Sequence, residues 1–378
     1  MRKKNRQPIW KKSPKRLKSL PSNMDLDTLR KKIDEIDQEV LKLLNERVRT
    51  AAEIGHVKRL EGSPIYVASR EEQVLRKLGK LNQGPLSDEA IRAIYREIMS
   101  AAIALEKPMR IAYLGPEATY THQAAIKKFG ASIDYIAAPA IPDVFHLVAK
   151  GEADHGVIPI ENSTEGAVSH SMDMFFESEL KICAQIFTPI SHSLISQSQP
   201  KDIERVYSKD QAIGQCRKWL HAHLPNASLQ ACDSTTKAVQ IAKEDPKAAA
   251  IASILASDLY GVPVVAEGIQ DRLDNTTRFL VIGKESSGYV SGVEFKSSFL
   301  ISVDHTVGAL EKALRVFSSR GLNLSKIESR PSGKTAWEYC FFLDVLGHFE
   351  EEPVAEAVKE LKEFCPFVKW LGSYPNAK

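Results

Sequence analysis

The sequence contains no long uninterrupted apolar run, and a helix needs such a run to cross a membrane. Cysteine is scarce as well: the five cysteines show neither paired metal-ligand spacing nor a compact disulfide framework. We therefore expect a reduced, cytoplasmic protein with no metal site and no membrane partner.

Acidic residues are absent from the first 23 positions, which hold nine lysines and arginines. The rest of the chain has 42 basic residues against 48 acidic ones, so nucleic-acid binding loses its main support. The basic segment also lacks the continuous apolar stretch of a secretory signal. We predict that residues 1–23 form a disordered extension, with Met24 as an alternative start of the protein.

Helical periodicity dominates residues 24–107 of a chain that, at 378 residues, is long enough for two or three domains. Apolar residues recur at threes and fours from Asp25 to Leu60, and similar patterns run from Ala68 to Leu81 and from Ser87 to Leu105. The pattern predicts an all-α three-helix unit. Its long helix leaves an apolar seam exposed, which favours a homodimer or a higher homo-oligomer.

Two further domains are predicted after Pro108. Residues 108–284 alternate apolar runs with helical segments, as α/β domains do, and a serine- and glycine-rich linker follows at 285–296. Residues 297–378 show the β-α-β-β-α-β order of a ferredoxin-like α+β fold. In the α/β domain we predict strands near Ile133, Gly156, Ile182, Val206, Leu229, Ala249 and Phe279, and helices near His122, Ile141, Gln211, Thr235 and Ser253. In the last domain we predict strands at Ser297–Val303, Leu322–Glu328, Trp337–Val345 and Val368–Tyr374, and helices at Val307–Ser319 and Pro353–Phe364.

Clusters of polar side chains border two apolar runs of the α/β domain. The run that begins at Gly156 stops at Glu161, Asn162, Ser163 and Thr164. The segment QDRLDNTTRFLVIG instead leads from polar residues into an apolar strand. Open α/β folds bind ligands beyond the carboxyl ends of their strands, although a helix cap or a strand-edge threonine would look the same.

These two segments resemble the prephenate dehydratase family, whose signatures are a PIENS-type loop and an N-x-T-R-F segment in that order. The resemblance implies two lobes of the periplasmic-binding-protein type with the site at the hinge. Thr277 would donate a hydrogen bond to the leaving ring hydroxyl, and Arg278 would bind a carboxylate or polarise Thr277. The sequence departs from the family where Ser208-Lys209-Asp210-Gln211 replaces S-H-P-Q, so histidine acid chemistry is not expected there. The implied catalytic residues are Thr119, Glu161, Asn162, Ser163, Gln215, Thr277 and Arg278.

The helical unit resembles the all-helical chorismate mutases between Leu26 and Glu106, through L-R-x-x-I-D-x-x-D, N-E-R, a lysine at the family spacing and S-R-E. Their pericyclic reaction uses no cofactor: arginines bind the two substrate carboxylates, and a cation stabilises charge on the ether oxygen. Surface ion pairs are the alternative role of such residues. The departures are Val67 for an aspartate and Glu106 for a glutamine, and Glu106 predicts activity that falls with rising pH. The implied chorismate-binding residues are Arg30, Arg47, Lys58, Arg70, Glu71 and Glu106, with Lys58 and Glu106 also catalytic.

The last domain resembles the ACT domains attached to prephenate dehydratases, through GAL at residues 308–310 and ESRP at 328–331. Helix packing is the alternative explanation of GAL alone. Together the motifs imply feedback inhibition by L-phenylalanine across a dimer. The implied effector residues are Gly308, Ala309, Leu310, Glu328, Ser329, Arg330 and Pro331.

The three resemblances follow one another along the chain and predict a bifunctional enzyme that converts chorismate, through prephenate, to phenylpyruvate. One alternative is a dehydratase with a decayed mutase unit, for which Val67 and Ala102 give some support. The other is a non-catalytic amino-acid sensor, which would need none of five residues whose joint presence argues against it: Arg30, Arg47, Lys58, Thr277 and Arg278.

Overall fold

The computed structural model describes residues 25–64, 66–106, 108–331 and 339–376. It forms two compact units, Met1–Val57 and Lys58–Lys378. The predictions for the basic extension, for Met24 and for Trp337 lie outside the described residues.

The expected three helices are present as α1 (Leu26–Leu60), α2 (Ala68–Leu81) and α3 (Asp88–Glu106). Ser87 caps α3, since its Oγ accepts the Ala90 N–H at 3.1 Å. In the first unit the apolar side of α1 is exposed: Ile33 is 58% exposed and Leu43 54%. No helix among the described residues is long and apolar enough to cross a membrane.

A mixed sheet in the order β2-β1-β3-β11-β5 forms the first lobe of the α/β domain. β1, β2 and β3 are parallel, and β11 is antiparallel between β3 and β5. Helix α4 packs on one face of the sheet, and α5 and α6 pack on the other. The strands are β1 (Arg110–Leu114), β2 (Asp134–Ala138), β3 (His155–Asn162), the short β4 (Gly166–Ala167), β5 (Lys181–Pro189) and β11 (Thr276–Gly283), and the helices are α4 (Tyr120–Phe129), α5 (Ile141–Lys150) and α6 (Ser169–Glu177).

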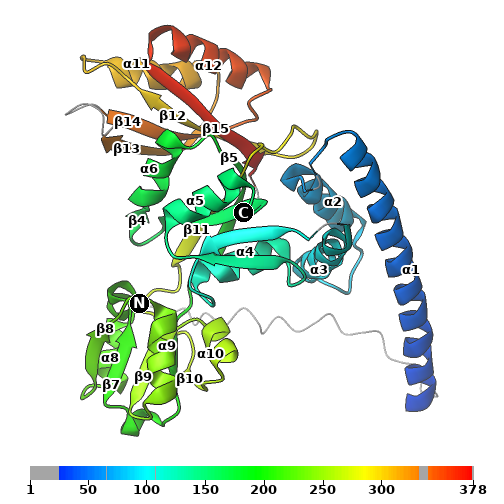
Figure 1. Ribbon diagram of the computed structural model, residues 1–378, viewed down its shortest axis with the longest axis vertical. Helices are drawn as coiled ribbons and strands as arrows, with labels where there is room; N and C mark the ends of the chain where they lie inside the picture. Colours follow the sequence, from blue (N-terminus) through cyan, green and yellow to red (C-terminus); the bar gives the residue numbers. More distant parts are fainter. Residues whose placement is uncertain (1–24, 65, 107, 332–338, 377–378) are drawn as a thin grey trace, which may run out of the picture. The chain divides into compact units, whose positions relative to one another are not determined.

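A second sheet, in the order β10-β6-β9-β7-β8, forms the other lobe (Figure 1). The chain enters this lobe after β5 and returns to the first sheet at β11, so two crossings join the lobes. The two-lobed α/β prediction is therefore confirmed. The elements are β6 (Ser193–Ser196), the 3-10 turn η2 (Pro200–Asp202), β7 (Arg205–Ser208), α7 (Asp210–Gln215), α8 (Arg217–His223), β8 (Ser228–Ala231), α9 (Thr235–Glu244), β9 (Ala248–Ala252), α10 (Ile254–Tyr260) and β10 (Val264–Ala266).

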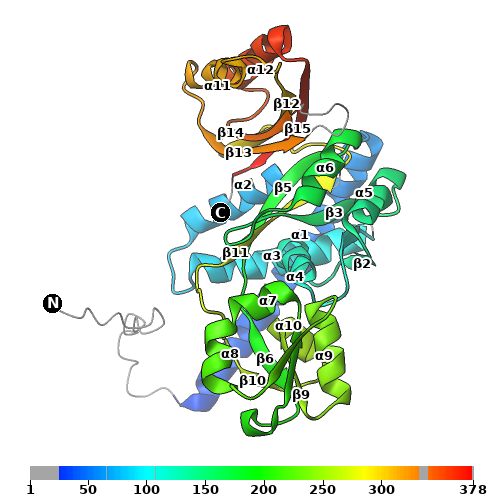
Figure 2. The ribbon, with the colours of Figure 1, turned by 90° about the vertical axis from the view of Figure 1, so that its left-hand side faces the viewer.

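The last domain has the expected β-α-β-β-α-β order and an antiparallel sheet β13-β14-β12-β15. Its two helices cover one face of this sheet (Figure 2). The other face packs on the first lobe, because Leu300 and Phe342 share a core with Ile158 and Leu280. The elements are β12 (Phe295–Ser302), α11 (Ala309–Ser318), β13 (Leu324–Pro331), β14 (Tyr339–Leu346), α12 (Glu352–Phe364) and β15 (Phe367–Pro375).

Candidate functional site

A bulge in β3 decides which side chains face the junction of the two lobes. Thr277 pairs with Asn162 and Arg278 with Glu161, but Phe279 pairs with Pro159, so Ile160 is an extra residue. Neighbouring strand residues point to opposite faces. Asn162 and Thr277 therefore face one side, and Glu161 and Arg278 face the other.

The Asn162 amide is held in one orientation by its hydrogen bonds. Its Oδ1 accepts the Thr164 N–H at 2.9 Å and the Thr164 hydroxyl at 2.6 Å. Its Nδ2 donates to Thr277 Oγ1 at 2.7 Å and to Asn275 Oδ1 at 2.8 Å. Because Thr277 Oγ1 already accepts a hydrogen bond, its own hydrogen remains to be donated. Within the described residues no acceptor for that hydrogen is found.

Further amides extend this pair into the second lobe. Gln215, at the end of α7, accepts the Asn275 amide at 2.9 Å and lies 2.8 Å from His192 Nε2. His192 Nδ1 in turn lies 2.9 Å from the Tyr120 hydroxyl. Burial lowers the pKa of His192, so its ring is neutral at neutral pH and carries hydrogen bonds rather than a charge. The sequence offered no motif signal for His192.

Thr119 and Ser163 shape the loops around this network. Thr119 caps α4, since its Oγ1 accepts the His122 N–H at 3.3 Å and donates to the Leu114 carbonyl at 3.0 Å. The ring of His122 accepts the Ala118 N–H at 3.1 Å, which is a structural role. Ser163 Oγ accepts the Thr276 N–H at 2.9 Å and so ties its loop to the start of β11.

Glu161 and Arg278 contact the last domain instead of this network. Arg278 Nη1 lies 2.5 Å from Asp344 Oδ2, and its Nη2 donates to the Tyr374 hydroxyl at 2.9 Å. Glu161 Oε2 lies 2.7 Å from Lys326 Nζ. The expected contact of Arg278 with Thr277 is therefore wrong, because adjacent strand residues point to opposite faces. Asp344, fully buried, was not predicted from the sequence.

The expected mutase residues lie in both units. In the first unit Arg30 Nη1 forms an exposed ion pair with Asp27 at 3.3 Å, and Arg47 lies on α1. In the second, Lys58 Nζ donates to the Pro64 carbonyl at 3.2 Å. Arg70 Nη1 donates to Gln73, and Val67 occupies the N-cap of α2 without a side-chain hydrogen bond.

Glu71 and Glu106 complete the expected mutase set in the second unit. Glu71 Oε2 lies 2.7 Å from Lys128 Nζ of α4 and accepts the Tyr66 hydroxyl at 2.9 Å. Glu106 ends α3, and its buried Oε1 has no hydrogen-bond partner within the described part of the chain.

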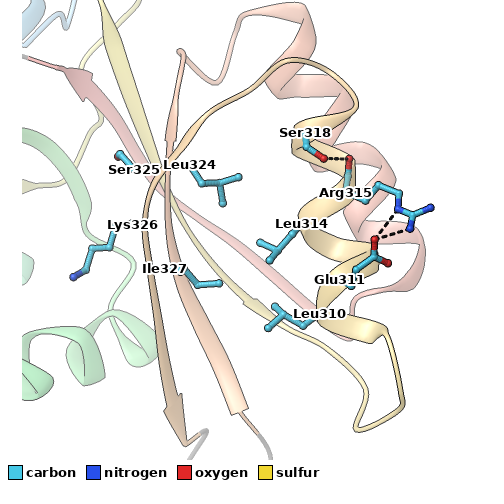
Figure 3. A pocket seen from close by; sticks show the side chains of 9 residues that line it. All are labelled: Leu310, Glu311, Leu314, Arg315, Ser318, Leu324, Ser325, Lys326 and Ile327. Atoms are coloured by element: carbon cyan, nitrogen blue, oxygen red, sulfur yellow. Dashed lines mark hydrogen bonds and ion pairs between the residues drawn. The ribbon is translucent and has the colours of Figure 1, made fainter.

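A hollow of about 760 Å³ separates α11 from β13. Leu310 and Leu314 reach into it from the helix, and Leu324 and Ile327 face them from the strand (Figure 3). Gly308 precedes α11 with φ of +83°, a conformation that favours glycine. Of the seven expected effector residues only Leu310 lines this hollow, because Glu328 and Arg330 interact with side chains on the opposite side of β13.

Comparison with known proteins gives matches along nearly the whole chain. Three family models match in succession: chorismate mutase type II at residues 29–107, prephenate dehydratase at 111–287 and the ACT domain at 297–363. A bifunctional chorismate mutase/prephenate dehydratase of Aquifex aeolicus is 48% identical over 358 residues, covering 93% of this chain and 98% of that protein.

Two solved structures each match 71% of the chain. A prephenate dehydratase of Arthrobacter aurescens in complex with L-Phe has a TM-score of 0.66 and 34% identity, covering 71% of this chain and 90% of that one. A protein titled GqqA, a quorum quenching acylase, has a TM-score of 0.65 and 26% identity, covering 71% and 98%. The match to the Aquifex protein covers all three domains, so the chain belongs to the bifunctional chorismate mutase/prephenate dehydratases.

Proposed function

We propose that this protein rearranges chorismate to prephenate, then decarboxylates and dehydrates prephenate to phenylpyruvate, under feedback inhibition by L-phenylalanine. The observation that carries the proposal is the Asn162–Thr277 hydrogen bond at the lobe junction, in a chain whose three domains match the family in order.

Dehydration of prephenate requires help for the departing ring hydroxyl, because loss of carbon dioxide and aromatisation already drive the rest. Thr277 supplies a hydrogen bond, since the Asn162 amide donates to its oxygen and its own hydrogen stays available for the substrate. A threonine hydroxyl is too weak an acid to transfer a free proton readily. Asn275, Gln215 and neutral His192 hold this donor in place without adding a charge that competes for it.

The other expected dehydratase residues act by positioning the network. Ser163 and Thr119 organise the loops that flank the network, and Gln215 joins the lobes. Glu161 and Arg278 connect the catalytic strands to the ACT sheet. Their effect on turnover is therefore indirect, through the orientation of Asn162 and Thr277.

The mutase activity depends on charge and positioning alone. Arg30, Arg47 and Arg70 bind the two carboxylates of chorismate, and Lys58 stabilises charge on the ether oxygen. Glu71 binds the substrate as well, and Glu106 is the proposed hydrogen-bond donor to the ether oxygen. No cofactor or metal takes part in either reaction.

L-Phenylalanine is the proposed effector of the ACT domain. Leu310, Leu314 and Ile327 offer an apolar surface suited to its aromatic ring. Across the proposed dimer, residues 308–310 of one copy and residues 328–331 of the second copy supply polar contacts to its amino and carboxylate groups, since within one copy Arg330 lies on the opposite side of β13 from the hollow. An effector that prefers one arrangement of the domain shifts the population of the whole enzyme toward it.

A homodimer, or a higher homo-oligomer, in the cytoplasm is the proposed state. The exposed apolar side of α1 and the free edge of β13 both leave surface for a second copy. The proposed domains are residues 24–107, 108–284 and 297–378, with a linker at 285–296.

To test this proposal, purified protein is incubated with chorismate, and prephenate and phenylpyruvate are measured over time, with and without phenylalanine. Phenylpyruvate formation that phenylalanine suppresses supports all three parts of the proposal. Persisting chorismate with conversion of added prephenate indicates a decayed mutase. Folded protein that converts neither substrate contradicts the proposal and favours a sensor.

A further inference from the structure

Two ion pairs link strand β13 to the dehydratase domain. Arg330 donates to both oxygens of Asp173 at 2.9 Å from Nη2, and its Nη1 donates to Ser169 Oγ at 3.0 Å. Lys326 Nζ lies 2.7 Å from Glu161 Oε2 and points away from the hollow (Figure 3). The two carboxylates of these ion pairs lie close to Asn162 in the sequence: Glu161 precedes it on β3, and Asp173 is on the next helix, α6.

Helix α6 is attached to the strand that ends in Asn162. Ser169 begins the helix just after the short strand β4, which pairs with β3 at Glu161 and Asn162, and the Val168 N–H donates to the Ile160 carbonyl at 2.9 Å. A shift of α6 therefore moves the segment that carries Asn162. The Asn162 amide, in turn, orients Thr277.

Two of the ion pairs between the dehydratase and ACT domains, Arg278–Asp344 and Arg330–Asp173, differ in how easily they exchange partners. Arg278 and Asp344 are 5% and 0% exposed, and a buried pair is costly to break. Arg330 and Asp173 are 25% and 47% exposed, where water can replace either partner at little cost. Arg278–Asp344 is thus a fixed anchor, and Arg330–Asp173 is the exchangeable contact.

We propose that phenylalanine competes with Asp173 for Arg330. This rests on the proposed function, in which the ESRP motif binds the effector, and Arg330 is the cation of that motif. Its guanidinium is already engaged by both Asp173 oxygens and by Ser169, so a carboxylate must displace them. Release of α6 then changes the position of Asn162, which makes Asp173 a positioning residue for the dehydratase.

The test is Asp173→Asn in the full chain, with phenylalanine binding measured by calorimetry and inhibition measured on prephenate. Without its competitor, phenylalanine binds about two- to fivefold more tightly. The factor by which saturating phenylalanine slows turnover falls at least fivefold. Ser169→Ala gives a smaller change in the same directions.

Glu177→Gln is the matched control, because it removes the same charge one turn along α6 from a side chain with no ion pair to any described residue. It leaves affinity and inhibition unchanged. Unchanged or weaker phenylalanine binding in Asp173→Asn, with inhibition retained, overturns the competition and leaves the proposed function standing. A parent chain that binds no phenylalanine contradicts the proposed regulation, and the competition with it.

Discussion

At the scale of single residues, the dehydratase site depends on the direction of its hydrogen bonds. The three donors from Thr164 and Glu165 fix Asn162 Oδ1 as an acceptor, so Nδ2 must donate to Thr277. The side chains that hold Thr277 are neutral amides, and the Glu165 carboxylate joins the network only at its edge, where it accepts from Gln215 Nε2 at 3.2 Å. Such an arrangement stabilises a departing hydroxide without binding a cation or an acid of its own.

Two substitutions of Thr277 distinguish the contribution of its hydroxyl to the rate from that of its side-chain shape. Thr277→Val keeps the shape and removes the donor, and we expect prephenate turnover to fall about 10²- to 10³-fold, as for other single donors to a developing charge. Thr277→Ser keeps the donor and should retain most of the rate. Steady-state kinetics on prephenate decides between them. Equal losses in the two variants would contradict the donor role.

Glu106→Gln tests whether a hydrogen-bond donor is needed at this position of the mutase. An amide N–H is always a donor, so we expect the variant to keep or raise the rate on chorismate. Initial rates on chorismate test this, with prephenate conversion as the control. A variant slower than the parent chain on chorismate alone would contradict the assignment.

At the scale of elements, a local irregularity in a strand determines which side chains face the site. The bulge at Ile160 turns Glu161 toward the ACT sheet and Asn162 toward Thr277. Helix α4 carries residues for two regions: Tyr120 reaches His192, and Lys128 reaches Glu71 of the mutase unit. Elements of one domain therefore support sites in another.

Lys128→Met should weaken the mutase without weakening the dehydratase. Lys128 Nζ lies 2.7 Å from Glu71 Oε2, and both side chains are largely buried, so removal of the cation leaves Glu71 poorly held for chorismate. We expect kcat/KM for chorismate to fall about tenfold, which corresponds to about 1.4 kcal/mol. Lys127→Met, on the same helix, is the control because its Nζ bonds the Phe187 carbonyl instead. A parallel loss on prephenate would indicate general damage.

His155 at the start of β3 makes stability depend on pH. Burial beside Tyr66 and Phe129 lowers its pKa to about 4, outweighing the opposite effect of Asp154. Between this value and the ordinary pKa near 6.5, the unfolded chain binds more protons, so stability falls as pH drops through that range. Urea unfolding at pH 7 and pH 4.5 should differ by up to about 3 kcal/mol from this group. His155→Phe should reduce the difference, and an unchanged difference would contradict it.

The sequence predicted the elements well where they are long or strongly periodic. Short segments such as β6, β10, α6 and α8 were not predicted, because a few residues do not establish a period. At the site, Asn162, Gln215 and Thr277, which the family resemblance implied, are joined by hydrogen bonds among themselves and through Asn275. The direction in which the Glu161 and Arg278 side chains point was not predictable, because it depends on the bulge in β3 and on the ACT sheet, which is distant in the sequence.

At the scale of the whole molecule, one chain carries a helical mutase unit, a two-lobed dehydratase and a regulatory ACT domain. The ACT sheet contributes Asp344 and Tyr374 to Arg278, directly beside the proposed catalytic threonine in the sequence. The contact with the ACT sheet and the proposed catalytic threonine therefore lie on opposite faces of strand β11. In the proposed mechanisms the two chemical steps use separate residues with opposite requirements: fixed charges for chorismate and neutral donors for prephenate.

The central claim is that these two activities occupy separate sites in one chain, and chorismate time courses of two variants test it most directly. Thr277→Val should accumulate prephenate, and Arg47→Ala should leave chorismate unreacted yet convert added prephenate. A mixture of the two variants should form phenylpyruvate from chorismate again. Equal loss of both activities in either folded variant, or a mixture that forms no phenylpyruvate, would contradict the account.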